Sequence, residues 1–193
     1  MAAPPFDWLD SMMWSIAASG LIVAIAALRL RYNATTDTIE EENKSLAAGL
    51  GLALTATGFY LFLAGITISF KWAFSSSYAN ILFGGAGALG GLVLISAGLA
   101  ITFRKGLQGT SYFALITAIY LLVDAVAIVQ YNRTSNPWQT AILYGAPAVA
   151  MILAVPATHV KNRAARWVFA VFAILYAIGW IYLAANTTMS HLS

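Results

Sequence analysis

The 193-residue sequence has no cysteine, only two histidines and few charged residues. Without cysteine the chain can form no disulfide, hold no thiolate-bound iron–sulfur cluster or c-type haem, and use no thiol as a nucleophile. Charged residues make up 9% of the chain and hydrophobic residues 61%, whereas a soluble domain carries roughly 25% charged residues. This is the composition of an integral membrane protein. No polar stretch is long enough for a separate soluble domain, so a single transmembrane domain over residues 1–193 is expected.

Six apolar runs are long enough to cross a bilayer as helices, which takes about 20 residues each. The runs are continuously apolar rather than alternating, which favours helices over the strands of a membrane barrel. We therefore expect an all-α, polytopic bundle of six transmembrane helices. The predicted spans are residues 11–30, 46–70, 78–103, 110–131, 139–160 and 166–186.

The basic residues between these runs are distributed unequally. Only Lys71 and Arg133 lie in the loops after the second and fourth runs. The positive-inside rule then predicts that the other three loops face the cytoplasm, with both termini outside, in a multi-pass protein of the cell membrane. Because topology explains the basic excess, we expect a lipid bilayer and no nucleic acid as partner. The loops after the first, third and fifth runs carry Arg29, Arg31, Lys44, Arg104, Lys105, Lys161, Arg163 and Arg166.

Tryptophans mark the predicted ends of the helices. Aromatic side chains of this kind gather at the two membrane–water interfaces. Trp180 lies deeper in the sixth run, so we expect it to pack within the bundle. The tryptophans near predicted helix ends are Trp8, Trp14, Trp72, Trp138 and Trp167.

Glycines recur at helical spacing in the second and third runs. Small residues let helix backbones approach closely in a membrane, where no hydrophobic effect drives association. Because a short turn joins these runs, we expect their glycines to face each other; the alternative is a groove for a lipid or a cofactor. The glycines proposed for helix packing are Gly58, Gly65, Gly84, Gly87, Gly91 and Gly98.

The third and fifth runs begin alike, with "ILFG" at 81–84 and "ILYG" at 142–145. This pattern indicates either parallel copies of one hairpin, as in some transporters, or a chance match between apolar segments. The fifth run also holds Pro147 and Pro156, each of which removes a backbone donor and frees a carbonyl one turn earlier. We expect a kink, with a broken helix lining a binding site as the alternative.

Asp124 is the only acid or base well inside any run. Its insertion costs about 2.5–3.5 kcal/mol, so it should face protein or water rather than lipid. Thr117 and Tyr120 share its helical face and form a polar seam with it. Two roles stay open: a protonated carboxyl that fixes helix packing through a hydrogen bond, or a group that transfers protons. Plausible bonding partners on neighbouring helices are Thr57, Tyr60 and Tyr144.

The two histidines are placed unfavourably for a haem. His159 falls at the inner end of the fifth run and His191 beyond the outer end of the sixth, so they cannot bind one haem together. No motif for a metal, a nucleotide or a catalytic triad is present, and we expect no cofactor, no metal and no enzymatic activity.

Four N-x-S/T sequons occur, of which two lie in segments predicted to be outside. Only these two could be reached by a glycosylation system that acts on the outer surface. The outer candidates are Asn132 and Asn186, and the inner sequons are Asn33 and Asn43.

The stretch "SSYANILFGGAGALGGLVLISAGLAI", with the second hairpin at "ILYG", resembles a group of polytopic membrane proteins. This group is the family numbered 981 among the domains of unknown function. In it a Tyr–x–Asn–x–x–Phe–Gly element leads into a glycine-rich membrane helix; here Gly85 stands where the group has an acid. The resemblance covers the second to fifth helices and implies a multi-helix membrane fold and no activity. The matching residues are Tyr78, Asn80, Phe83 and Gly84.

Two functions are compatible with these features. The first is a non-catalytic subunit that packs against other integral membrane subunits, such as those of a respiratory or electron-transfer complex. The small size and the lack of a soluble domain or redox ligands favour it. The alternative is a small solute transporter or proton-coupled carrier that uses Asp124, favoured by that carboxylate, the two prolines and the possible repeat.

Overall fold

The computed structural model describes residues 8–32, 38–71, 77–160 and 162–192. The described chain folds into six α-helices, each long and apolar enough to cross a membrane. The predicted all-α membrane fold with six spans is confirmed. A short 3-10 helix, η1 (Glu41–Asn43), precedes the second α-helix. The six helices are α1 (Trp8–Arg29), α2 (Lys44–Lys71), α3 (Ser77–Thr102), α4 (Gln108–Gln130), α5 (Pro137–His159) and α6 (Arg163–Leu192).

The helices differ most from the predicted spans at the end of α6, which continues beyond residue 186 to Leu192. The polar end of α6 stays helical because it is bonded to its own backbone and to α1. Thr187 Oγ1 donates to the carbonyl of Leu183 at 3.0 Å. Thr188 Oγ1 donates to the Asp10 carboxylate at 2.9 and 3.0 Å. Sequence hydropathy cannot detect these contacts, so the predicted span was too short.

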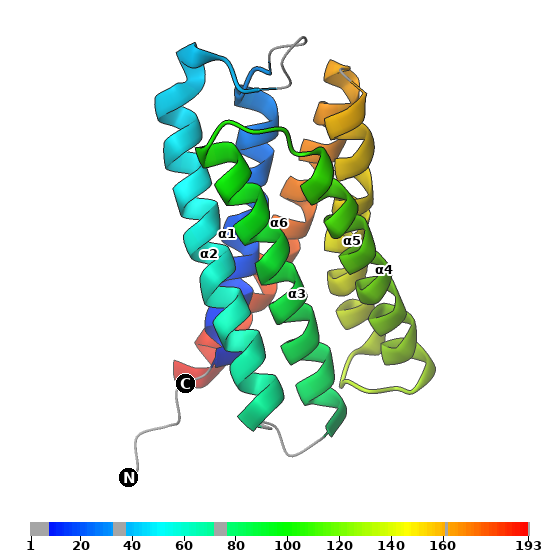
Figure 1. Cartoon of the computed structure of the whole chain (residues 1–193). Helices are drawn as coiled ribbons and strands as arrows, with labels where there is room; N and C mark the ends of the chain where they lie inside the picture. Colours follow the sequence, from blue (N-terminus) through cyan, green and yellow to red (C-terminus); the bar gives the residue numbers. More distant parts are fainter. Residues whose placement is uncertain (1–7, 33–37, 72–76, 161, 193) are drawn as a thin grey trace.

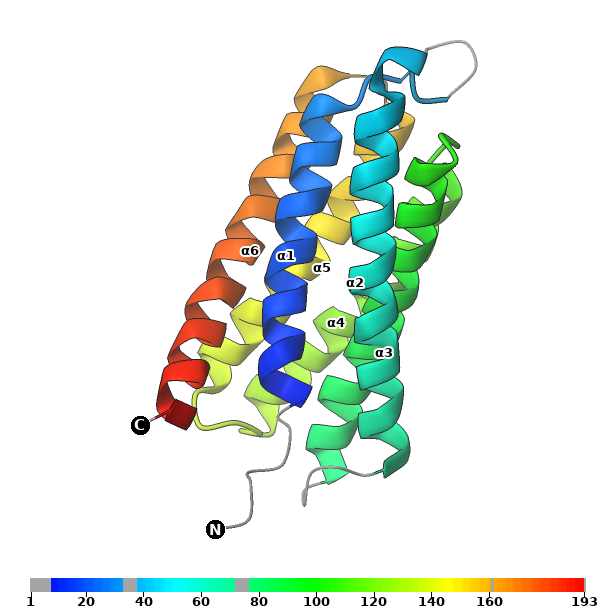
Figure 2. The same cartoon turned by 90° about the vertical axis from the view of Figure 1, so that its left-hand side faces the viewer.

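The six helices form a closed ring (Figures 1 and 2). Each helix packs against its neighbours in the chain, and α6 closes the ring against α1. Three antiparallel pairs, α2 with α3, α4 with α5, and α1 with α6, make the most extensive contacts. The buried apolar side chains accordingly form three clusters between neighbouring helices. This arrangement brings inward-facing side chains of all six helices to a common axis.

The two ends of the ring differ in charge. Helix α1 begins and α6 ends at one end, which we call the terminal end; the α1–α2, α3–α4 and α5–α6 connections lie at the other, the basic end (Figure 1). The terminal end carries Lys71 and Arg133, and Lys161 lies outside the described residues. The described residues at the basic end include Arg29, Arg31, Lys44, Arg104, Lys105, Arg163 and Arg166.

Helices α2 and α3 pack backbone to backbone through their glycines. A Cβ atom built on Gly58 would lie 2.7 Å from the carbonyl oxygen of Gly91, and one built on Gly91 would lie 2.6 Å from that of Gly58. The same reciprocal contact recurs one heptad away on each side, where the Cβ–oxygen distances are 2.6 Å for Gly65 against Gly84 and for Gly98 against Gly51. At these three levels the backbones of α2 and α3 are therefore in direct contact, whereas a Cβ atom on Gly87 would first meet Met12 of α1.

The outward faces of the helices carry large apolar side chains, as a lipid bilayer requires. Trp14, Trp138 and Trp167 are 43%, 70% and 48% exposed, whereas Trp180 is 6% exposed and packs within the bundle as predicted. The side chain of Trp8 and all of Trp72 lie outside the described residues.

Candidate functional site

Two cavities lie inside the ring, one after the other along its length. The basic-side cavity has a volume of about 270 Å³, and the terminal-side cavity about 80 Å³. Every helix contributes to both. One lining residue from each helix in turn defines the basic-side cavity: Val23, Leu54, Leu94, Ser111, Met151 and Phe169. The corresponding residues of the terminal-side cavity are Met12, Leu61, Phe83, Leu121, Tyr144 and Trp180.

Four side chains separate the two cavities and line both of them. They come from α3, α5 and α6, and they are mostly apolar. Because both cavities share these residues, the cavities are adjacent along the ring. The shared residues are Leu94, Pro147, Met151 and Tyr176.

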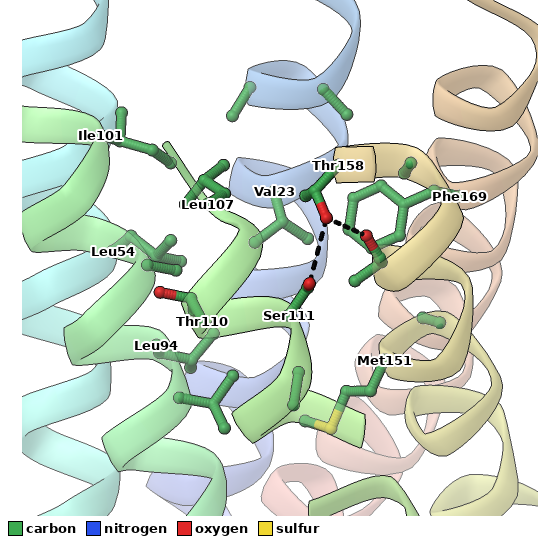
Figure 3. A pocket seen from close by; sticks show the side chains of 18 of the residues that line it. Val23, Leu54, Leu94, Ile101, Leu107, Thr110, Ser111, Met151, Thr158 and Phe169 are labelled. Atoms are coloured by element: carbon green, nitrogen blue, oxygen red, sulfur yellow. Dashed lines mark hydrogen bonds between the residues drawn. The ribbon is translucent and has the colours of Figure 1, made fainter. Parts of the chain in front are cut away.

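Hydroxyl groups form one polar part of the lining of the basic-side cavity. Thr158 on α5 donates to Ser111 Oγ on α4 at 3.0 Å (Figure 3). Ser111 in turn donates to the carbonyl of Gln108 at 2.7 Å. Thr110 and Ser96 share a hydrogen bond of 2.8 Å between α4 and α3. These bonds hold neighbouring helices together beside the cavity, while the hydroxyl oxygens keep acceptor capacity for a molecule inside it.

One charged side chain lines the basic-side cavity in the described part of the chain. This residue is Arg166, near the start of α6 at the basic end. Its Nη1 donates to the backbone carbonyl of Leu30 at 3.2 Å, just beyond the end of α1. The bond joins α6 to α1 and places the guanidinium at the rim of the cavity.

Aromatic side chains dominate the terminal-side cavity. The ring of Tyr144 lies between those of Phe83 and Trp180, with ring centroids 6.5 Å apart in each case. Phe83 and Tyr144 occupy the same position in the "ILFG" and "ILYG" segments. Together with the apolar residues of α1, α2 and α4 named above, these rings leave only a small void. The terminal side of the ring axis is thus lined by an aromatic layer.

Pro147, in the interior of α5, forms part of the wall between the cavities. Pro147 has no N–H, so the carbonyl of Leu143, one turn earlier, lacks its usual helical donor. The buried indole Nε1 of Trp180 donates to this carbonyl at 3.1 Å. Helix α5 therefore continues without a break from Pro137 to His159, and the freed carbonyl is satisfied from α6.

Asp124 faces protein, since it is only 7% exposed on α4. Its seam neighbours Thr117 and Tyr120 donate to backbone carbonyls, to Phe113 at 3.2 Å and to Ile81 at 3.3 Å. By contrast, the buried Oδ2 of Asp124 has no hydrogen-bond partner among the described residues. The carboxyl lines neither cavity, so it lies beside the axis and not on it.

The predicted bonding partners of Asp124 on α2 are wrong. Thr57 donates to the carbonyl of Ala53 at 2.8 Å, and Tyr60 bonds to Ser11 on α1. In the described chain, α2 and α4 are not neighbours in the ring. The third candidate, Tyr144 on α5, lies within electrostatic reach of Asp124, but no hydrogen bond joins them.

The remaining candidates lie at the ends of the ring. His159 ends α5 at the basic end, with Nδ1 2.9 Å from the carbonyl of Val155, whereas His191 lies in the last turn of α6 at the opposite end. Asn132 is exposed in the turn after α4, with φ 50°, but Asn186 lies within the helix α6. An exposed turn is the usual site of a glycosylation sequon, and modification of either asparagine stays a prediction.

Comparison with known proteins supports the fold and adds no assigned activity. A family model described as "Protein of unknown function (DUF981)" matches residues 1–193. No curated protein sequence matches the chain. The fold is similar to the cryo-electron-microscopy structure of the Helicobacter pylori urea channel in its closed state, with a TM-score of 0.70 and 16% sequence identity. The similarity covers 95% of this chain and 98% of that one.

Proposed function

Since this chain belongs to the family described as protein of unknown function DUF981, whose description assigns no activity, we propose a function from the geometry of the ring. The protein forms a pathway through which a small uncharged solute crosses the membrane. The observation that carries this proposal is the pair of cavities along the ring, each lined by all six helices and separated by one shared wall.

The lining favours a small solute without charge. In the described chain one charged side chain, Arg166, lines the basic-side cavity and none lines the terminal-side cavity. An ion would lose its hydration shell against apolar walls without the rings of charges or carbonyls that ion pathways supply. A neutral solute with hydrogen-bonding groups loses less hydration free energy than an ion does. The hydroxyls of Ser111 and Thr158 offer acceptors to such a solute.

The similar fold of the urea channel supports this proposal. That protein carries urea, a small neutral molecule, and its structure is described as closed. The aromatic layer of Phe83, Tyr144 and Trp180 would be the closed element of this chain. Opening requires only that side chains of this layer and of the shared wall move, because the helices already surround the axis.

The charge asymmetry supports an orientation in the cell membrane. The basic end faces the cytoplasm in this proposal, because cytoplasmic loops carry the excess of Lys and Arg. The basic-side cavity would then open towards the cytoplasm and the aromatic layer would lie towards the outside. The other function predicted from the sequence, a non-catalytic subunit of a larger membrane complex, stays a prediction. Co-purification of a stoichiometric partner would favour it.

Solute permeation into liposomes tests the proposal. Purified protein is reconstituted, and the permeation of urea is compared with that of guanidinium, a cation of similar size and shape. We expect faster urea permeation than in protein-free liposomes and no such increase for guanidinium. If neither solute permeates faster, or if both do, the proposed pathway for uncharged solutes is wrong.

A matched pair of glycine variants locates the pathway. Gly90 lines the terminal-side cavity, and a Cβ atom there would meet no atom within 4 Å; Gly145 has the same free space but lines neither cavity. Gly90→Leu should therefore block urea permeation while Gly145→Leu leaves it unchanged. Equal permeation by both variants would place the route elsewhere.

A further inference from the structure

The guanidinium of Arg166 is only partly used by the protein. An arginine offers five N–H donors, and one of these bonds to the carbonyl of Leu30. In the described chain the ion pairs join Glu41 to Arg104 and to Lys44, so no carboxylate pairs with Arg166. A half-buried arginine without an acidic partner leaves strong donors for an external acceptor.

The cavity beside Arg166 is mainly apolar. Its walls near the basic end include Val23, Leu54, Ile101 and Phe169 (Figure 3). The hydroxyls of Ser111 and Thr158 already donate to protein atoms. They therefore have no hydrogen left to donate to a ligand. The site therefore combines one cationic anchor at its rim with an apolar interior.

We propose that the basic-side cavity binds a monocarboxylate with a short aliphatic chain. The carboxylate lies against the Arg166 guanidinium, whose planar fork matches two carboxylate oxygens. The chain lies among the apolar walls. A dicarboxylate is disfavoured because its second charge would enter that apolar interior without a cation.

The volume of the cavity sets the size of the ligand. A cavity of about 150 Å³ lined by apolar side chains holds benzene. The basic-side cavity has a volume of about 270 Å³. Scaled from benzene, it can hold a ligand of about ten non-hydrogen atoms. Octanoate has this size, whereas a phospholipid with two long chains does not fit.

This binding site goes beyond the proposed solute pathway and does not depend on it. The anchor and the apolar walls exist whether or not a solute crosses the ring. If the pathway also exists, a bound carboxylate occupies its basic side and should slow urea permeation. Binding and permeation are measured separately, so failure of one proposal is distinguishable from failure of the other.

Binding is tested with the full chain in nanodiscs of zwitterionic lipid, because detergents would compete for the cavity. Octanoate, octan-1-ol and octylammonium are titrated by calorimetry, with empty nanodiscs as the baseline for partitioning into lipid. We expect saturable binding of octanoate and affinity at least about tenfold weaker for the other two, since a charged hydrogen bond is lost. Equal affinity for all three would overturn the role of Arg166.

Variants separate the anchor from the walls. Arg166→Gln should weaken octanoate binding about tenfold, while Arg163→Gln, on an exposed residue of the same helix, should not. Arg166 also holds α1, so a second variant keeps it intact: Ala114→Leu narrows the cavity and should abolish binding while Arg166 remains. Unchanged octanoate affinity in folded Arg166→Gln and Ala114→Leu proteins would overturn the proposal.

Discussion

Trp180 on α6 donates its indole N–H to the backbone carbonyl of Leu143 on α5, at 3.1 Å. This carbonyl is free because the residue four positions later is Pro147, which has no N–H. The pair therefore replaces one hydrogen bond within a helix by one between helices. It also places the largest side chain of the aromatic layer at a fixed position beside the shared wall of the two cavities.

The hydrogen-bonding role of Trp180 is predicted to depend on Pro147. Trp180→Phe should lower the free energy of unfolding by about 1 kcal/mol, because the Leu143 carbonyl loses its donor. In a Pro147→Ala background, the alanine N–H supplies that donor, so the same change should cost less. A double-mutant cycle by unfolding in mixed micelles measures the difference. Equal costs in both backgrounds would show that the hydrogen bond contributes nothing.

The close packing of α2 on α3 is predicted to tolerate no side chain at Gly58. A methyl group there would lie 2.7 Å from the Gly91 carbonyl oxygen, so Gly58→Ala should force the helices apart and cost about 1–3 kcal/mol of unfolding free energy. Gly49 is the control on the same helix, because a Cβ atom there meets nothing within 4 Å. Gly49→Ala should stabilise the helix by about 0.5–1 kcal/mol. Comparable thermal stabilities of the two variants would contradict the packing.

The six helices and the contact between glycines follow from features that are local in sequence. Long apolar runs specify membrane helices, and glycines seven residues apart along two neighbouring runs specify one face of each helix. The polar extension of α6 could not be found in this way, because it depends on contacts such as that between Thr188 and Asp10, 178 positions apart.

The cavities could not be predicted because their lining has no distinct composition. Leu94 lines both cavities, whereas Leu99 on the same helix is 42% exposed on the outside; sequence alone offers no difference between them. The sequence did mark Pro147 as a place where a helix could line a site. The sequence also singled out Asp124. The prediction of its hydrogen-bond partners on α2 was wrong because α2 and α4 are not neighbours in the ring of described helices.

Cysteine labelling tests the proposed orientation in a chain that has no cysteine of its own. Lys105 is exposed in the α3–α4 turn at the basic end, and Ser135 is exposed in the α4–α5 turn at the terminal end. In intact cells a membrane-impermeant maleimide should label Ser135→Cys but not Lys105→Cys. Permeabilised cells should show labelling of both. Labelling of only Lys105→Cys in intact cells would reverse the orientation.

The ion pair between Glu41 and Arg104 at the basic end predicts a specific titration. The Arg104 guanidinium, followed by Lys44, lowers the pKa of the Glu41 carboxyl below its ordinary value of 4.5. A lowered folded-state pKa means that the contact stabilises the fold above pH 4.5 and is lost as the pH falls through the folded-state pKa. Carboxyl NMR should show a higher Glu41 midpoint in Arg104→Gln than in the native chain. An unchanged midpoint would mean that the pair does not persist in solution.

Unlike the exposed and ion-paired Glu41, Asp124 has a buried carboxyl whose Oδ2 has no hydrogen-bond partner among the described residues. If a hydrogen bond to another helix held it, Asp124→Leu would strand the partner and cost about 1–2 kcal/mol. Without such a bond, an apolar group of similar size should leave the free energy of unfolding unchanged or raise it by about 1 kcal/mol. Thermal unfolding of the two purified proteins distinguishes these outcomes, with Asp124→Asn as the control that keeps size and polarity.

The same variants separate passive permeation from proton coupling. Because Asp124 lines neither cavity, Asp124→Asn should leave urea permeation into liposomes unchanged. A proton-coupled carrier would instead need a carboxyl that exchanges protons, which the amide cannot do, so solute uptake driven by a pH gradient would disappear in that variant. Loss of uptake in a protein that remains folded would assign Asp124 a role in transport. If urea permeation is unaltered in Asp124→Asn and the Asp124→Leu protein is stable, the pathway follows the axis of the ring and does not use Asp124.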